Sequence, residues 1–198
     1  MTTTIFLVRH GSTDHLGQVI SGRMDGVALN DAGRREAAAV AGRLRGEGLE
    51  ALYASPLQRT RETAAAIGGA LGLEPQAEDG LLEIDFGDWT GARFADLDGD
   101  PAWRRWNDER SAARAPNGET MAEVQDRLVR WVETARTRHP GGRVCAVSHA
   151  DVIKALLAHV LGFSLDRHAA IEVGPGSVSV LCAGDWGMKV LSVNEACR

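Results

Sequence analysis

Two histidines of the chain follow short apolar runs, and each stands where its imidazole could do chemistry. His10 comes after the run IFLV and Arg9, and Gly11 next to it would let the backbone approach a ligand. His149 comes after the run VCAV and Ser148. A histidine that ends a strand is more often a hydrogen-bonded structural residue than a nucleophile, so neither position is decisive alone. A neutral imidazole in such a place can nevertheless attack phosphorus or carry a proton.

An arginine follows a third apolar run in a similar way. The run ALYA ends at residue 54, and Ser55, Pro56 and then Arg59 come after it. A Ser-Pro pair suits the cap and first position of a helix, which would place Arg59 on the first turn. In an open α/β sheet, ligands bind beyond the carboxyl ends of the strands. Two imidazoles and the guanidiniums of Arg9 and Arg59 would meet there, and a phosphoryl group suits this cationic set.

The elements that must position these groups alternate along the chain. Helical spacing of apolar residues, together with caps and glycine stops, predicts four helices over about residues 30–45, 55–71, 120–138 and 152–161. The strand-then-helix order favours an α/β fold with a mostly parallel central sheet and helices on both faces. The last part of the chain differs, because residues 177–182 and 188–193 alternate in polarity about a glycine turn. This pattern predicts a terminal β-hairpin.

Composition and charge narrow the classes of function. With 198 residues, 44% of them hydrophobic, the chain can bury one core, and we expect a single domain over residues 1–198. A formal net charge of -5 argues against a nucleic-acid partner. The three cysteines have neither disulfide nor zinc spacing and predict reduced thiols in the cytoplasm. No apolar window reaches the length of a bilayer span and no export signal is seen, so no membrane partner is expected.

Four segments of the chain form an ordered set. They are RHG at residues 9–11, SPLQRTRET at 55–63, LLEIDFGDWTG at 81–91 and SHA at 148–150. RHG alone is a weak signal, whereas four segments in this order and in these strand and helix contexts are specific. Together they resemble the histidine phosphatase superfamily, also called the phosphoglycerate mutase-like family. The resemblance covers nearly the whole chain and implies that family's fold, with a helical or irregular lid inserted at about residues 91–118.

The resemblance also implies a role for each candidate catalytic residue. His10 would be the nucleophile that accepts the phosphoryl group as a phosphohistidine. Arg9, Arg59 and His149 would form the phosphate pocket and counter the charge that develops during in-line transfer. Glu83 would protonate the leaving alcohol and then activate water. From the residues alone Glu83 would be read as a surface carboxylate, so its role rests on the resemblance.

Further substrate-binding residues and one departure complete the expected pocket. Ser21, Gly22 and Ala150 are expected to bind substrate, and Ala150 offers a backbone N–H where the family often has glycine. Many relatives follow RHG with a tryptophan-asparagine pair whose asparagine contacts phosphate, but His15 and Leu16 stand at these positions. We expect a water, a backbone amide or another side chain to replace this donor. His15 becomes a candidate for the rim of the pocket.

The predicted lid bears on the type of reaction. It is short, and its PAWRRW and PNGET segments resemble those of the small phosphatases rather than those of the longer mutases. We therefore predict a phosphomonoester hydrolase that acts on a small phosphorylated metabolite through phosphohistidine. The alternatives are transfer of the phosphoglycerate mutase type and a non-catalytic phosphate-binding scaffold. No cofactor or metal site is expected.

The lid also holds the residues expected to choose the substrate. Trp103, Arg104, Arg105 and Trp106 would face the leaving group, unless the tryptophans pack the lid onto the core. The resemblance names phosphoglycerates, fructose bisphosphates, sugar phosphates and α-ribazole phosphate as substrate classes, without choosing among them. Dimers occur in the family, so a monomer and a homodimer both stay open.

Overall fold

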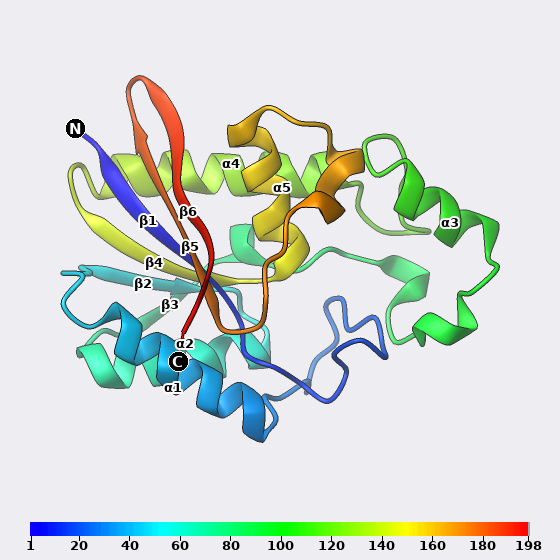
Figure 1. The fold of residues 1–198 in the computed structure, drawn as a ribbon, viewed down its shortest axis with the longest axis horizontal. Coiled ribbons are helices and arrows are strands. Elements are labelled where there is room, and N and C mark those ends of the chain that lie inside the picture. The colour runs from blue at the N-terminus through cyan, green and yellow to red at the C-terminus, as the bar shows by residue number, and fades with distance from the viewer. Residues whose placement is uncertain (198) are drawn as a thin grey trace.

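The protein is built on one six-stranded sheet with the strand order β3-β2-β4-β1-β5-β6 (Figure 1). The computed structural model describes residues 1–197. Strands β1 to β4 run parallel, whereas β5 and β6 are antiparallel to their neighbours. The strands are β1 (Thr3–Arg9), β2 (Ala51–Ala54), β3 (Pro75–Ala77), β4 (Arg143–Ser148), β5 (Ser177–Gly184) and β6 (Gly187–Ala196).

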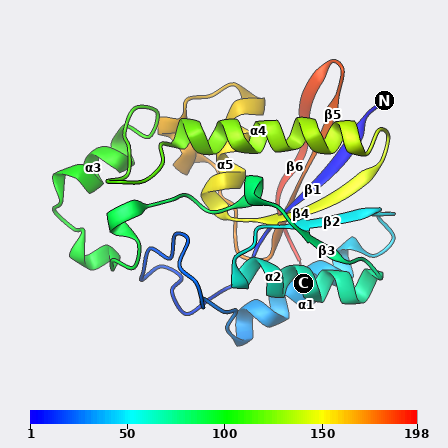
Figure 2. The ribbon, with the colours of Figure 1, turned by 180° about the vertical axis from the view of Figure 1, so that it is seen from behind.

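Helices cover both faces of this sheet. The long helices are α1 (Asp31–Leu44) and α2 (Gln58–Leu71) on one face, and α4 (Met121–Arg138) and α5 (Ala150–Leu161) on the other (Figures 1 and 2). The β1 side chains alternate between the two hydrophobic cores: Ile5 and Leu7 pack with α4 and α5, whereas Phe6 and Val8 pack with α1 and α2. Period-2 alternation on a strand buried on both faces thus builds two cores.

The predicted α/β fold is confirmed, and most of the predicted elements are present. Asn30 caps α1, Thr120 and Glu123 form the capping box of α4, and the C-terminal strands form the hairpin. The start of α2 differs from the prediction: Leu57 is its N-cap, and Ser55 and Pro56 precede the helix. Strand β3 was not predicted, because three residues at a sheet edge are too few to show alternation.

The parallel register brings the carboxyl ends of β1, β2 and β4 to one edge. Arg9 lies opposite Ser148, and Ala54 lies opposite Val147. The His10 backbone N–H then donates to the Ser148 carbonyl oxygen at 3.1 Å. The residues that follow the three strands therefore leave the sheet side by side, as a ligand site at this edge requires.

The loop after β1 lies unusually close to the first turn of α1. A Cβ atom on Gly11 would stand 2.4 Å from the Gly33 carbonyl oxygen, and one on Gly33 would stand 2.1 Å from the Ser12 carbonyl oxygen. The backbone N–H of Gly11 also donates to Thr63 Oγ1 of α2 at 3.2 Å. Gly11 was expected to let the backbone approach a ligand. The structure shows instead that it lets the backbone approach helix α1, where a side chain would not fit.

This contact predicts opposite effects for two glycines of the same helix. Gly33→Ala should destabilise the fold by about 1–3 kcal/mol, because the added methyl must push the backbone of the RHG loop away. Gly42→Ala, whose methyl meets nothing within 4 Å, should stabilise by about 0.5–1 kcal/mol through helix propensity. Urea unfolding midpoints of both variants measure this. Equal shifts in the two would show that the loop contact does not constrain the fold.

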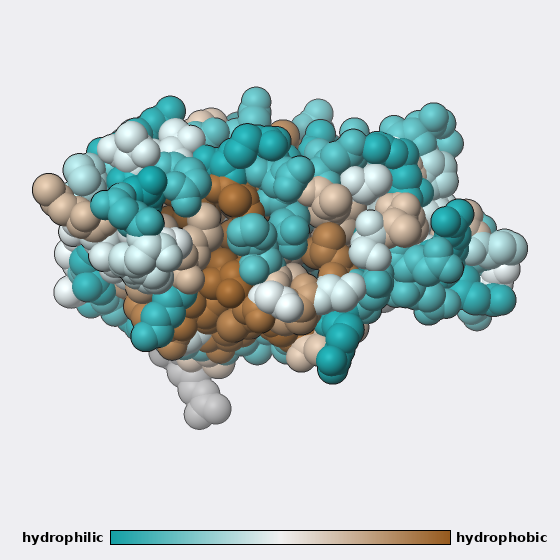
Figure 3. Space-filling model, turned by 90° about the horizontal axis from the view of Figure 1, so that it is seen from above, coloured by the Kyte–Doolittle hydropathy of each residue, from teal (hydrophilic) through white to brown (hydrophobic). Residues whose placement is uncertain are grey.

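The chain between Trp89 and Thr120 lies beyond one end of the sheet. It contains the short helix α3 (Pro101–Asp108), together with the 3-10 turn η3 (Phe94–Asp96), and its outer surface is mostly hydrophilic (Figures 1 and 3). The other 3-10 turns are η1 (Asp79–Leu81), η2 (Gly87–Trp89) and η4 (Leu165–Ala170). Of the helices within residues 1–197, none combines the length and the hydrophobicity that a bilayer span needs.

Candidate active site

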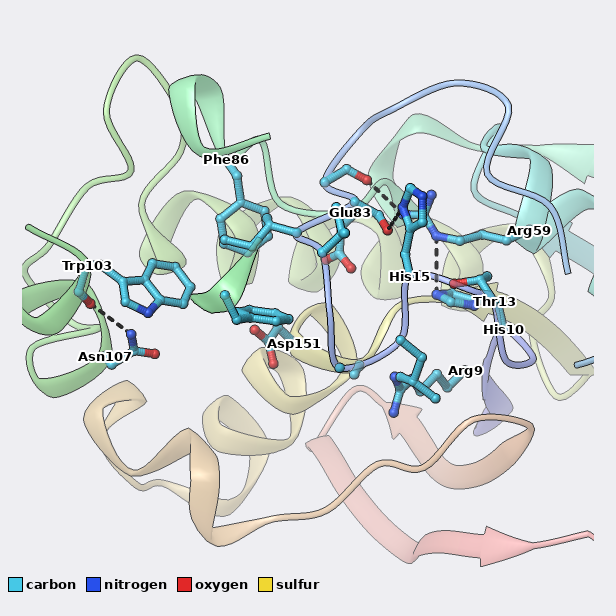
Figure 4. Close-up of a pocket in the computed structure, with 18 of the residues that line it drawn as sticks. Arg9, His10, Thr13, His15, Arg59, Glu83, Phe86, Trp103, Asn107 and Asp151 are labelled. Carbon is cyan, nitrogen blue, oxygen red and sulfur yellow. Dashed lines mark hydrogen bonds between the residues drawn. The ribbon is translucent and has the colours of Figure 1, made fainter. Parts of the chain in front are cut away.

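A cavity of about 300 Å³ opens at the carboxyl ends of the parallel strands (Figure 4). Most residues predicted for the site line it, namely Arg9, His10, Ser21, Gly22, Arg59, Glu83 and Ala150, together with His15 at the expected rim. His149 is fully buried and reaches the others through Arg59. The structure therefore gathers the whole predicted set, from four separate segments of the chain.

The imidazole of His10 is oriented by its own loop. Its Nδ1 is 2.7 Å from the Gly11 carbonyl oxygen, which can only accept, so Nδ1 carries the proton and Nε2 keeps its lone pair. Burial, followed by the positive charge of Arg59, lowers the pKa of His10 to about 3. The Nε2 lone pair accepts a hydrogen bond from Arg59 Nε at 3.3 Å, and an unprotonated nitrogen on a neutral ring is what a nucleophilic imidazole needs.

Two guanidiniums that line the cavity each leave an enclosed N–H group without a partner in the described chain. Arg59 donates from Nε to His10 Nε2 at 3.3 Å and from Nη2 to the Gly22 carbonyl oxygen at 2.7 Å, and its Nη1 has no partner in the described chain. Arg9 donates from Nη1 to the Val173 carbonyl oxygen at 2.7 Å and leaves Nε without a partner there. Buried polar groups are almost always satisfied, so these donors indicate a site for an anion.

His149 lies against both Arg59 and His10. Its Nδ1 is 3.3 Å from Arg59 Nη2, its Nε2 is 3.0 Å from Ser55 Oγ, and its ring centroid is 5.1 Å from that of His10. Burial and then the charge of Arg59 hold the pKa of His149 well below its usual range. The ring is therefore neutral in the empty site, and a bound dianion would favour its protonated, donating form.

Glu83 faces the same point from the opposite side of the cavity. Its side chain is 16% exposed, and Oε2 is 3.6 Å from His149 Nδ1. Burial raises the pKa of this carboxyl, and the negative charge of Asp151 raises it further, against the opposing effect of Arg59. A carboxyl with a raised pKa can hold a proton near neutral pH and deliver it to a leaving oxygen.

The backbone around Glu83 is fixed by three contacts. Arg23 Nε donates to its carbonyl oxygen at 2.9 Å, and Arg127 Nη2 donates to the same atom at 3.1 Å. Ser148 Oγ donates to the Leu81 carbonyl oxygen at 2.8 Å, which ties this loop to the end of β4. Glu83 belongs to no helix or strand, so these contacts hold its backbone, while the Ile84 backbone N–H donates to its carboxyl Oε1 at 2.9 Å.

The four lid residues divide between the two alternatives: one tryptophan faces the cavity, the other packs the lid onto the core, and neither arginine faces the cavity. Trp103 lines the cavity, as predicted. Trp106 is 0% exposed and packs against Phe86 and Trp89, so it belongs to the core. Arg105 is exposed and pairs with Glu109, and Arg104 does not line the cavity. Neighbouring helical positions point about 100° apart, so the four residues could not all face one ligand.

Several lining residues were not predicted from the sequence. They are Thr13, Phe86, Asn107, Arg110 and Asp151. A first-turn acid such as Asp151 is common at helix N-termini, which hides any functional role. Leu16, which replaces the usual asparagine, lines the cavity and is half exposed. Thr13 also lines the cavity, and its hydroxyl is a candidate to replace the hydrogen bond that the asparagine of other family members makes to phosphate.

The arrangement defines a class of protein: an α/β fold with a neutral imidazole, unpaired guanidinium donors and a carboxyl of raised pKa at one sheet edge. The chain belongs to the histidine phosphatase superfamily (branch 1), whose model matches residues 5–196. It is similar to phosphoserine phosphatase 1 of Hydrogenobacter thermophilus, with 31% identity over 98% of this chain and 93% of that protein. Both the family and the fold predicted from the four segments are thus confirmed.

Two other relatives show how far the likeness extends. The structure of mycobacterial glucosyl-3-phosphoglycerate phosphatase matches with a TM-score of 0.87 and 26% identity, over 98% of this chain and 100% of that one. A bifunctional protein of Mycobacterium tuberculosis is 37% identical over 78% of this chain, but the match covers only 43% of that protein. The chain thus spans less than half the length of that relative.

Proposed function

We propose that this protein hydrolyses phosphomonoesters of small metabolites through a phosphohistidine formed on His10. The observation that carries the proposal is the placement of His10 Nε2 3.3 Å from Arg59 Nε, in a cavity that Arg9 and Glu83 also line, while Arg9 Nε and Arg59 Nη1 have no partner in the described chain. A phosphate dianion would satisfy those donors, and phosphorus would then lie next to the nucleophile. The phosphatase names of the relatives support the same reaction.

The first half-reaction forms a bond from His10 Nε2 to phosphorus while the ester P–O bond breaks. The proton of the Glu83 carboxyl passes to the departing oxygen, so an alcohol leaves and a carboxylate stays behind. Arg9 and Arg59 hold the equatorial oxygens and counter their charge, and His149 donates to them once it is protonated.

The second half-reaction returns the enzyme to its starting state. Glu83, now a carboxylate, takes a proton from water, and the water oxygen attacks phosphorus. The P–N bond to His10 breaks, so inorganic phosphate leaves and the Nε2 lone pair is restored. Each proton that Glu83 gives in the first step is regained in the second.

The proposal extends to the chain as a whole. Residues 1–198 would act as a single domain, with the segment at about residues 91–118 as a lid that bears the leaving-group contacts. The support is Trp103, which reaches the cavity from α3. The free cysteines Cys145, Cys182 and Cys197 support a reducing, cytoplasmic setting. Phosphoserine and phosphorylated sugar acids are the substrates that the names of the relatives suggest.

Two measurements distinguish hydrolysis from mutase-type transfer. With 3-phosphoglycerate or phosphoserine, we expect free inorganic phosphate to be released at the rate at which ester is consumed. Rapid acid-free quenching should trap a phosphoenzyme that is stable to base and labile to acid, as phosphohistidine is. Fast isomer exchange with negligible free phosphate would contradict hydrolysis, and absence of the phosphoenzyme would contradict the covalent route.

A further inference from the structure

The outer half of the cavity contains an ion pair that takes no part in the two proposed half-reactions. Arg110 Nη1 donates to Asp151 Oδ2 at 3.1 Å, Arg110 Nη2 donates to Asn107 Oδ1 at 3.2 Å, and the guanidinium stacks on Trp106. The Arg110 side chain is 6% exposed, whereas that of Asp151 is 25% exposed. Arg110 is thus enclosed, and Asp151 is the member of the pair that meets the cavity.

One oxygen of Asp151 is free for a ligand. Within residues 1–197, Oδ2 accepts from Arg110, and Oδ1 has no hydrogen-bond partner. Burial alone would raise the pKa of this carboxyl, but Arg110 and Lys154 together hold it below its ordinary value. In the view of Figure 4, Asp151 lies between His10 and Trp103, on the wall of the same cavity. A leaving group attached to phosphorus at His10 would point toward it.

The charges along the cavity divide into two sets. Arg9 and Arg59 stand at the His10 end and are free for the phosphate dianion. At the far end, the cation of Arg110 is already neutralised by Asp151. The negative charge of Asp151 also acts at Arg9 and Glu83: burial lowers the pKa of Arg9 and Asp151 opposes that effect, whereas burial raises the pKa of Glu83 and Asp151 adds to the rise. Among the described residues that line this end of the cavity, Arg110 is the one cation and it is already paired, so a second anion on the leaving group would meet the Asp151 carboxylate without a free guanidinium.

If the proposed function holds, these charges decide which alcohols are accepted. We propose that Asp151 selects the leaving group, favouring alcohols that offer a hydrogen-bond donor, above all an ammonium group, and opposing those that carry an anion in its place. The apolar walls formed by Phe86 and Trp103 would pack against the carbon skeleton.

The test uses two esters of equal length and opposite charge. Phosphoethanolamine carries an ammonium group at the position where 2-phosphoglycolate carries a carboxylate. We expect the wild-type kcat/KM to favour phosphoethanolamine by at least about tenfold, as one charge pair of moderate strength allows. Asp151→Asn, which removes the charge and releases Arg110, should reduce that ratio by about tenfold or more. If it folds poorly, Asp151→Ser, also suited to a first helical turn, gives the same comparison.

A matched control separates the effect of the Asp151 charge from any effect of a displaced lid. Asp166 lies outside the cavity and holds Ser111, the residue that follows Arg110 in the chain. Its carboxylate accepts from the backbone N–H of Ser111 at 2.7 Å and from the Ser111 hydroxyl at 2.9 Å. Asp166→Asn should leave the ratio of the two esters unchanged. An equal change in both variants, or an unchanged ratio in Asp151→Asn, would overturn the inference. If wild type hydrolysed neither these esters nor p-nitrophenyl phosphate, the proposed function itself would fail.

Discussion

Replacing His10 by alanine is expected to lower kcat for any phosphomonoester by at least about 10⁴-fold, since no other group can form the covalent intermediate. His10 is the only imidazole of the described chain that lines the cavity next to both unpaired guanidiniums. His149, its neighbour, is buried behind Arg59 and cannot take over in-line attack. Release of inorganic phosphate from p-nitrophenyl phosphate, in the presence of excess enzyme, measures the loss.

Two controls make this loss interpretable. His159→Ala, on the exposed side of α5, removes an imidazole of the same kind and should keep the wild-type rate. His10→Ala should still bind vanadate or phosphate, because the unpaired donors of Arg9 and Arg59 stay in place. Equal rates in wild type and His10→Ala would end the assignment of His10 as nucleophile. Loss of both activity and anion binding would instead indicate a collapsed site.

Glu83→Gln should separate the two half-reactions. For an alkyl ester, kcat should fall by about 10²–10⁴-fold, because the leaving oxygen is no longer protonated. Nitrophenolate leaves without a proton, so p-nitrophenyl phosphate should still phosphorylate His10. The second step needs a base, however, and the phosphoenzyme should accumulate. Stopped-flow absorbance should therefore show a burst of nitrophenol, close to one equivalent, followed by a slow steady state.

The pH dependence of kcat/KM tests whether Glu83 is the general acid. His10, whose pKa is lowered to about 3, stays neutral over the working range, so it adds no acid limb to the free enzyme. Glu83 must be protonated to act as an acid, and its pKa is raised by burial. The kcat/KM for an alkyl ester should thus fall as pH rises through that pKa, and this basic limb should be missing in Glu83→Gln. Glu133→Gln, on the exposed surface of α4, is the matched control, and an unchanged profile in Glu83→Gln would move the acid elsewhere.

Sequence patterns predicted the part of the site that regular elements position. Three apolar strands and one amphipathic helix fix where Arg9, His10, Arg59 and His149 leave the sheet, because parallel strands align their carboxyl ends. Glu83 required the family resemblance, since it lies in a loop whose shape depends on distant arginines. The hydrophobic periodicity of a sequence gives no information about such long-range contacts.

The pair of Arg110 and Asp151 shows where such prediction ends. Asp151 follows the SHA segment directly and still gives no signal, because an acid on a first helical turn is ordinary. Arg110 is enclosed only because its loop turns back over Trp106 and toward α5, a contact across 41 residues of chain. A lone arginine in an irregular segment would otherwise be expected on the surface. Tertiary packing, rather than local pattern, determines this part of the cavity.

The unpaired N–H groups of Arg9 and Arg59 have a consequence beyond catalysis. A buried cation without a full set of acceptors opposes folding, and an oxyanion that supplies those acceptors relieves the penalty. Occupancy of the pocket and the melting temperature are therefore linked quantities: an anion at 100 times its Kd would add about 2.7 kcal/mol to the free energy of unfolding. The product of the reaction is itself such an anion, so inorganic phosphate should raise the melting temperature of the protein over the same concentration range in which it inhibits the enzyme.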